Sequence, residues 1–292
     1  MQLRGANLGL NKTHDDIALL FTHGANSVRW QLFTGDDTSK WTFANYILWI
    51  ETNLTELQNA LPVFPAGTKI VVALMTPWGG ANFTKLQKGI SNFTATWVYI
   101  AQRLKDIEQV WGYDMVNEPS ASNDVLSTIQ YNTARAIRRS NREKNCIATF
   151  MHSSYDQLAK SKPISGIDYY TFNMYFSMNY THQGLENRKD HILYTQGQAT
   201  TALDRVNNWA TRYKKKIYVG EFSAVKWADK GSAWLHEVSS YLNKVGWDWA
   251  YHAWREAWMW DLELPPDRTT MDGNLRTRTF RLEVMEDAWR NR

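Results

Sequence analysis

Short apolar runs recur along the chain every few tens of residues, and stretches with helical periodicity separate them. Several of the runs lack a clean alternation of apolar and polar residues, as parallel strands do when both of their faces are buried. The pattern therefore predicts eight strands. They span residues 3–7, 27–31, 69–74, 112–116, 146–150, 169–174, 216–219 and 247–253.

The segments between these runs carry helix signals. Thr13 can cap a helix over residues 14–23, and Gly24 ends it. A second helix, with apolar residues at helical spacing, runs over residues 41–59, and Pro62 lies beyond its end. The other large helices are predicted over residues 125–140, 196–214 and 232–245.

Eight strands that alternate with helices predict an α/β fold, a closed (β/α)8 TIM barrel. The chain has 292 residues and no low-complexity linker, so we expect one catalytic domain over residues 1–292. Such a barrel typically needs about 250 residues. An open doubly wound sheet fits the same pattern, but the chain has neither a GxGxxG motif after a strand nor a Walker loop, which weakens its nucleotide-binding version.

The chain is rich in aromatic residues, with 15 Trp, 14 Tyr and 11 Phe. This is more than a core usually needs, and the surplus favours a cleft that stacks flat ligands such as sugar rings. An unusually aromatic core is the alternative explanation.

The net charge of +4 is a mild excess of basic residues, and the run at residues 214–216 fits a solvated helix end. We therefore expect no nucleic acid as partner. No apolar window is long enough to span a membrane, so we expect no membrane partner either. A single cysteine, Cys146, excludes an intrachain disulfide. We expect a secreted monomer whose leader is not part of this chain.

The residues at the strand ends carry the candidate chemistry, because the active site of a (β/α)8 barrel lies at the carboxyl ends of its strands. Glu118 follows the fourth predicted strand and Glu221 the seventh, so two carboxylates should face each other across one mouth. Either glutamate alone would fit a loop or an ion pair equally well. Together they predict glycoside hydrolysis, in which Glu118 is the general acid/base and Glu221 the nucleophile of a retaining enzyme.

Other strand ends supply groups that could support this pair. Arg29 would keep the nucleophile ionised, and Tyr175 could hold its carboxylate by a hydrogen bond. Asn117 could bind the sugar hydroxyl next to the reacting carbon. Neither a metal-ligand cluster nor a cofactor motif is found, and this chemistry requires no cofactor.

Two motifs at these strand ends resemble glycoside hydrolase family 5, the cellulase family of clan A. Asn-Glu-Pro at residues 117–119 resembles the acid/base signature, and Gly-Glu-Phe at residues 220–222 the nucleophile signature. The resemblance covers about residues 3–256 and implies a retaining enzyme on a TIM barrel. Further similarity lies at residues 4–9, 28–30 and 136–141 and at Trp254, which matches the aromatic residue after strand eight.

The chain departs from this family at two places. The family usually carries a histidine after strand three, where this chain has none, and another two residues before the strand-six tyrosine, where this chain has Asn173. We expect Asn173 to form hydrogen bonds without a titration of its own. His152, after strand five, could replace one lost contact, although a surface histidine fits it equally well.

These features predict an endo-acting hydrolase of a β-linked polysaccharide, with β-1,4-glucan as the leading substrate. A β-mannanase or β-1,3-glucanase with the same catalytic pair is the nearest alternative. A carbohydrate-binding barrel without turnover is an alternative of another class, which the two intact glutamates disfavour. The candidate stacking platforms along the cleft are Trp30, Trp78, Trp227 and Trp254.

Overall fold

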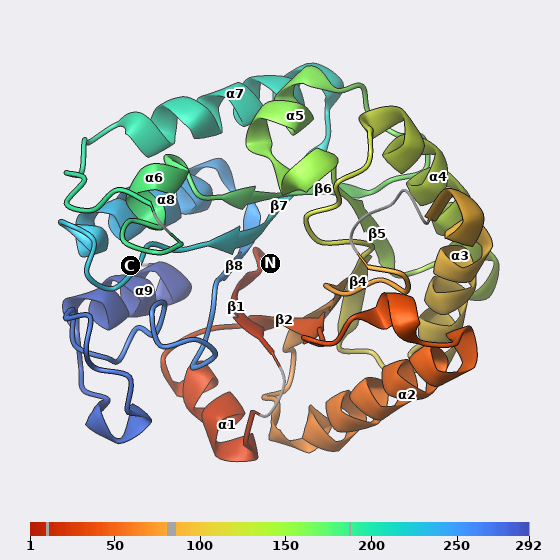
Figure 1. Ribbon diagram of the computed structural model, residues 1–292, viewed down its shortest axis with the longest axis horizontal. Coiled ribbons are helices and arrows are strands. Elements are labelled where there is room, and N and C mark those ends of the chain that lie inside the picture. The colour runs from red at the N-terminus through yellow and green to blue at the C-terminus, as the bar shows by residue number, and fades with distance from the viewer. Residues whose placement is uncertain (10–11, 81–85, 187, 292) are drawn as a thin grey trace.

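The computed structural model describes residues 1–9, 12–80, 86–186 and 188–291. Within these residues, eight parallel strands close into a barrel in chain order, β1 to β8 (Figure 1). The closure lies between β1 and β8, where Arg4 pairs with Trp249. The strands are β1 (Arg4–Leu8), β2 (Ser27–Leu32), β3 (Lys69–Leu74), β4 (Val110–Asp114), β5 (Asn145–Ala148), β6 (Tyr169–Met174), β7 (Lys216–Phe222) and β8 (Asp248–Tyr251).

A ring of helices surrounds the barrel, and each strand is followed by at least one helix (Figure 1). The predicted (β/α)8 fold is therefore confirmed, and the closed barrel excludes the open doubly wound sheet. The helices are α1 (His14–Thr22), α2 (Phe43–Ala60), α3 (Leu86–Arg103), α4 (Asn123–Ser140), α5 (Tyr155–Lys160), α6 (Met178–Thr181), α7 (Gln198–Tyr213), α8 (Gly231–Val245) and α9 (Phe280–Arg290). Short 3-10 turns are η1 (Thr38–Lys40), η2 (Leu61–Val63), η3 (Met151–Ser153) and η4 (Gly273–Leu275).

Local sequence signals account for several helix boundaries. Thr13 caps α1 through a reciprocal capping box with Asp16, as its position in the sequence indicates. Helix α9 was not predicted, yet it completes the ring. Its Trp289 is buried and donates an indole hydrogen bond of 3.1 Å to the carbonyl oxygen of Gly5 in β1.

The interior of the barrel has an apolar lower part and a polar upper part. The apolar part contains Val71, Ile147 and Tyr218 from three different strands. Nearer the carboxyl ends of the strands, the buried polar residues include Arg29 and Glu221. Neighbouring side chains of a strand point to opposite faces. Each strand therefore contributes some side chains to the barrel interior and others to the packing against the helices.

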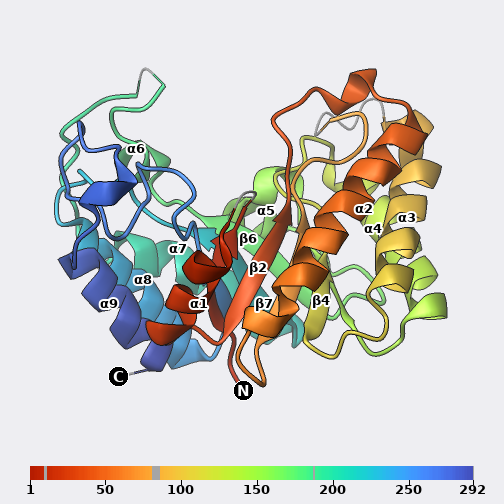
Figure 2. The ribbon, with the colours of Figure 1, turned by 90° about the horizontal axis from the view of Figure 1, so that it is seen from below.

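Loops at the carboxyl ends of the strands rise above the barrel on two sides (Figure 2). The segments after β6 and β8 stand on one side, and the segment between β2 and α2 stands on the other. Among the described residues, no helix has the length and apolarity needed to cross a membrane.

Candidate active site

Glu221 lies near the carboxyl end of β7, and its residue is only 4% exposed. The preceding residue, Gly220, leaves the space that Glu221's partners need. A Cβ atom at Gly220 would lie 2.8 Å from Thr171 Oγ1 and 3.4 Å from the guanidinium carbon of Arg29. A side chain at this position would therefore clash with Thr171 and come into contact with the guanidinium of Arg29.

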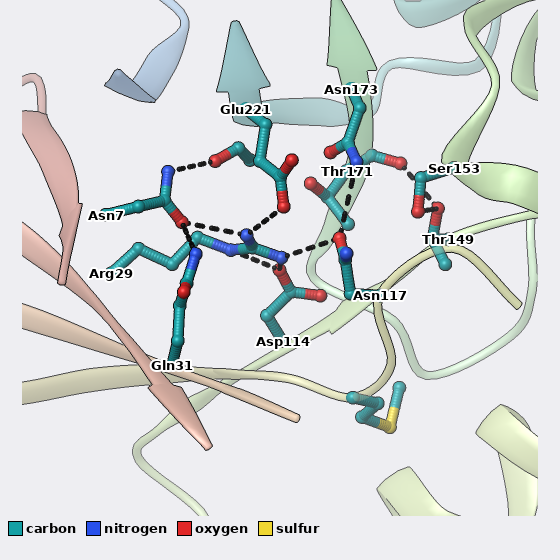
Figure 3. Close-up of polar contacts among 12 residues, drawn as sticks. Asn7, Arg29, Gln31, Asp114, Asn117, Thr149, Ser153, Thr171, Asn173 and Glu221 are labelled. Carbon is teal, nitrogen blue, oxygen red and sulfur yellow. Dashed lines mark hydrogen bonds and ion pairs between the residues drawn. The ribbon is translucent and has the colours of Figure 1, made fainter. Parts of the chain in front are cut away.

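Arg29 on β2 connects two buried carboxylates (Figure 3). Its Nη1 lies 2.9 Å from Glu221 Oε1, and its Nη2 lies 2.8 Å from Asp114 Oδ2. Nη2 also donates to Asn117 Oδ1 at 3.1 Å, and Nη1 donates to Asn7 Oδ1 at 2.9 Å. The planar fork of donors thus holds the Glu221 carboxylate in one orientation.

The second oxygen of Glu221 has its own donor. The Tyr175 hydroxyl donates to Glu221 Oε2 at 2.9 Å, as the sequence predicts. Burial and the neighbouring glutamates raise the pKa of Tyr175 well above its usual value, so the hydroxyl keeps its proton. Burial alone would raise the pKa of Glu221, but His252, Arg29 and the hydrogen bond from Tyr175 outweigh it and lower that pKa.

Glu118 follows β4 in a strained turn. Its φ of 45° lies in the left-handed region that favours glycine. Turn η3, which follows β5, holds this turn in place. The Glu118 N–H donates to Ser153 Oγ at 2.9 Å, and the His152 N–H donates to the Pro119 carbonyl oxygen at 2.6 Å.

The carboxyl group of Glu118 reaches the same mouth, although its residue is more exposed than Glu221. Asn173 Nδ2 donates to Glu118 Oε1 at 2.9 Å and lies 3.3 Å from Asn117 Oδ1. Burial of the carboxyl group, followed by the negative charge of Glu221, raises the pKa of Glu118 above its usual value. The hydrogen bond from Asn173 opposes this rise.

The mouth therefore contains two carboxyl groups with opposite electrostatic settings. The pKa of Glu118 is raised, whereas the pKa of Glu221 is lowered. A carboxyl group with a raised pKa keeps its proton to higher pH and suits a general acid, and one with a lowered pKa stays ionised and suits a nucleophile. Of the sequence candidates, Arg29, Asn117, Asn173 and Tyr175 all meet at this pair.

Two of the predicted stacking platforms were wrong. Trp254 is 1% exposed, donates its indole N–H to the Asp16 carbonyl oxygen at 2.8 Å, and packs edge-on against Trp289. Because β8 ends at Tyr251, Trp254 has already turned away towards α1 and α9. Trp30 is 6% exposed, because alternation along β2 places it on the face opposite Arg29.

The remaining tryptophan candidates are half-buried in the loops above the barrel. Trp78 donates its indole N–H to the Trp41 carbonyl oxygen at 3.1 Å. Trp227 has Trp258 at a ring distance of 5.3 Å and the Arg268 guanidinium carbon at 5.3 Å. Both rings are fixed in place and keep part of their surface open.

His152 contributes to the site through its backbone N–H, and the residue is exposed. Three residues near the mouth were not singled out from the sequence. His252 lies directly after β8 and 3.8 Å from Glu221, and Asp114 ends β4. Phe33, directly after β2, is 42% exposed. Their positions at strand ends were the signal that could have identified them.

Among the described residues, no group of three or more His, Cys, Asp or Glu side chains is arranged to hold a metal ion. A closed (β/α)8 barrel with two glutamates of opposite pKa shifts, one after β4 and one near the carboxyl end of β7, has the architecture of a glycoside hydrolase. Residues 1–256 match the family described as cellulase, glycosyl hydrolase family 5, and the chain belongs to that family.

The chain also resembles a curated protein, Endoglucanase H of Acetivibrio thermocellus, with 24% identity over 207 residues. That alignment covers 67% of this chain, and the chain spans about a fifth (22%) of the length of that relative.

Solved structures share the fold at low sequence identity. An endoglucanase has a TM-score of 0.77 at 17% identity and covers 99% of this chain and 97% of its own. Thermotoga maritima Cel5A in complex with mannotriose has a TM-score of 0.77 at 18% identity, with 97% of each chain covered. Endo-glycoceramidase II from Rhodococcus has a TM-score of 0.72 at 15% identity and covers 98% of this chain and 79% of its own.

Proposed function

We propose that this protein is a retaining, endo-acting hydrolase of a β-linked polysaccharide, with β-1,4-glucan as its main substrate. The observation that carries the proposal is the arrangement at the barrel mouth, where Arg29 and Tyr175 each bind one oxygen of Glu221 and Asn173 binds Glu118. The pKa of Glu118 is shifted upward and that of Glu221 downward, which agrees with this division of roles. A double displacement needs one protonated carboxylic acid and one ionised carboxylate at the same bond.

In the first step, Glu118 gives its proton to the glycosidic oxygen while Glu221 attacks the anomeric carbon. The glycosidic C–O bond breaks, the leaving sugar departs as an alcohol, and a glycosyl ester forms on Glu221. In the second step, Glu118 as a carboxylate removes a proton from water. The water oxygen replaces Glu221 at the anomeric carbon, which returns both groups to their starting states.

The neighbouring residues prepare this chemistry. Arg29 and Tyr175 each bind one oxygen of Glu221, so the attacking carboxylate needs little reorientation. The oxygen of Asn117 already accepts bonds from Arg29 and Asn173, which leaves its NH2 group to donate to a sugar hydroxyl beside the reacting carbon.

Family membership and the activities of similar proteins support β-1,4-glucan as the substrate. The curated relative and one solved structure are endoglucanases, and another solved structure is an endo-β-1,4-glucanase. A complex of Thermotoga maritima Cel5A with mannotriose favours a β-mannanase as the second candidate. Initial rates on soluble β-1,4-glucan, β-mannan and β-1,3-glucan decide between these substrates. The loss of viscosity per reducing end formed measures endo action.

The retaining mechanism is tested by proton NMR of the first-formed product in deuterated buffer. We expect the β-anomer to appear first and the α-anomer only through later mutarotation. A 2-deoxy-2-fluoro glycoside with an activated leaving group should add one sugar mass to the wild type but not to Glu221→Gln. An initial α-anomer would refute the retaining mechanism.

No turnover on any glycan, with oligosaccharide binding intact, would indicate a carbohydrate-binding barrel without activity instead. Monomeric state and secretion stay predictions.

A further inference from the structure

His252 lies at the mouth of the barrel, beside the end of β8. It is the first residue after that strand, and its backbone N–H donates to the Phe222 carbonyl oxygen at 3.1 Å. This bond ties the residue to the end of β7, next to Glu221. The side chain is 17% exposed, so it borders the mouth without being free in solvent.

The imidazole of His252 faces the nucleophile candidate without bonding to it. Its Nδ1 lies 3.8 Å from Glu221 Oε2, beyond the length of a hydrogen bond. This Nδ1 is buried and has no hydrogen-bond partner within the described protein. The ring of Trp260 lies edge-on to the imidazole at a centroid distance of 6.4 Å.

We propose that His252 is a positioning residue that sets the charge around Glu221. It thereby sets the barrier for the attack of Glu221 on the sugar relative to the barrier for the release of Glu221 from the glycosyl ester. The proposal rests on the proposed function of Glu221 as nucleophile. It stands on the 3.8 Å separation of His252 Nδ1 from Glu221 Oε2, on the buried nitrogen without a partner and on the neighbouring Trp260 ring.

Two charges at this separation interact strongly in a partly buried site, because little water screens them. A protonated His252 stabilises Glu221 as an anion. The attack on sugar consumes that anion, whereas hydrolysis of the glycosyl ester restores it. Protonation of His252 should therefore slow the first step and speed the second. Histidine suits this task, since its charge changes near neutral pH.

Other charged groups face the same imidazole. Glu118 after β4 and His182 at the end of α6 both interact electrostatically with His252. Burial lowers the pKa of His182 to about 4, so this second imidazole is neutral at working pH. Arg29 binds the other oxygen of Glu221, and the Tyr175 hydroxyl binds the same oxygen that His252 approaches. The Nδ1 of His252 has no hydrogen-bond partner among the described residues, so the charge of this imidazole can change without breaking a hydrogen bond at that nitrogen.

The direct test is an NMR titration of the histidine imidazoles in the wild type and in Glu221→Gln. Loss of the carboxylate should move the His252 titration to lower pH, because the imidazolium loses its negative neighbour. His191, whose side chain is 93% exposed, provides the internal reference and should not move. An unchanged His252 titration in the folded variant would overturn the proposal. The titration does not depend on catalysis, so it separates this inference from the proposed function.

The kinetic test uses His252→Asn, with His191→Asn as the matched control. The charge on His252 lowers the pKa of both Glu221 and Glu118, so its removal should move both limbs of the kcat/KM profile to higher pH. A purely structural role would scale the whole profile without shifting it, and that result would refute the proposal. Thermal melts identify any loss of folded protein. If Glu221→Gln kept its activity while the His252 titration still shifted, the role of Glu221 as nucleophile would fail, and the charge coupling between His252 and Glu221 would stand without its effect on the reaction.

Discussion

Asn173 in β6 donates a hydrogen bond of 2.9 Å to Glu118, the glutamate that follows β4. The amide therefore acts on the acid/base candidate, whereas Tyr175, two residues further along the chain, acts on Glu221. The carboxyl end of β6 thus supplies a hydrogen-bond donor to each of the two glutamates. A hydrogen bond to the ionised form of a carboxyl group favours that form.

Replacement of Asn173 by alanine should raise the pKa of Glu118, because the bond that favours its carboxylate is lost. Glu118 would then stay protonated to higher pH, so the basic limb of the kcat/KM profile should move to higher pH. We expect kcat/KM at the optimum to fall about tenfold, the loss of roughly one hydrogen bond to a charged group. The acid limb serves as the internal control. A basic limb identical to that of the wild type would contradict this assignment.

Replacement of Glu118 by glutamine should lower activity on polysaccharide by about 10²- to 10⁴-fold, the usual contribution of a general acid. Glycosides with activated leaving groups should react much better, because they need little protonation. Glu221→Gln should be inactive on both kinds of substrate. Rates on a dinitrophenyl glycoside and on soluble glucan distinguish the two roles. Equal losses in the two variants on both substrates would show that the assignment is wrong.

Arg29→Gln should raise the pKa of Glu221 and move the acid limb to higher pH, since the cation that favours the carboxylate is gone. It should also cost about 3–5 kcal/mol of unfolding free energy, because Asp114 and Glu221 lose their buried partner. Arg29→Lys keeps the charge but not the fork of donors, and should shift the acid limb less.

The lowered pKa of Glu221 in the folded wild type also contributes to its stability. This contribution is present at neutral pH and is lost as pH falls. Denaturant melts from pH 3 to 7 measure it.

Ser153→Ala removes the acceptor of the Glu118 N–H and should loosen the strained turn that presents the acid/base group. Activity on polysaccharide should fall by roughly tenfold, because a misplaced acid loses proximity. Activity on a dinitrophenyl glycoside should fall less. Ser154→Ala offers a neighbouring control, since its hydroxyl caps α5 instead. Equal losses on both substrates would place the role of Ser153 in folding alone.

Trp254→Ala should destabilise the protein by about 3–5 kcal/mol, the usual cost of emptying a buried tryptophan site. Oligosaccharide affinity per folded molecule should stay at the wild-type level. Trp78→Ala is the matched comparison, because its half-exposed ring lies in a loop above the barrel. That variant should weaken oligosaccharide binding by about 2 kcal/mol, as removal of an aromatic anchor does. Calorimetric binding combined with thermal melts separates these outcomes, and the reverse pattern would refute both assignments.

The sequence by itself determined the barrel, and it was enough to propose Glu118 and Glu221 as the catalytic pair. Apolar runs spaced by helical segments indicate strands buried on both faces, and eight such units have few ways to close. Glu118 and Glu221 could be selected because the fold places strand ends at one mouth, whatever the details of packing. Asn117, Asn173 and Tyr175 were accessible by the same argument, since they lie at or just beyond strand ends, whereas Arg29 lies within β2.

Only the tertiary structure decided which aromatic rings face the mouth and which groups set its charges. Trp254 and His252 lie two residues apart, and the point at which β8 ends places the first in the core and the second beside Glu221. The partnership of Arg29 with Asp114 likewise joins residues from different strands. Periodicity shows which residues share a face of one strand. It does not show where a strand ends or what an adjacent strand offers, because both depend on contacts between segments far apart in the chain.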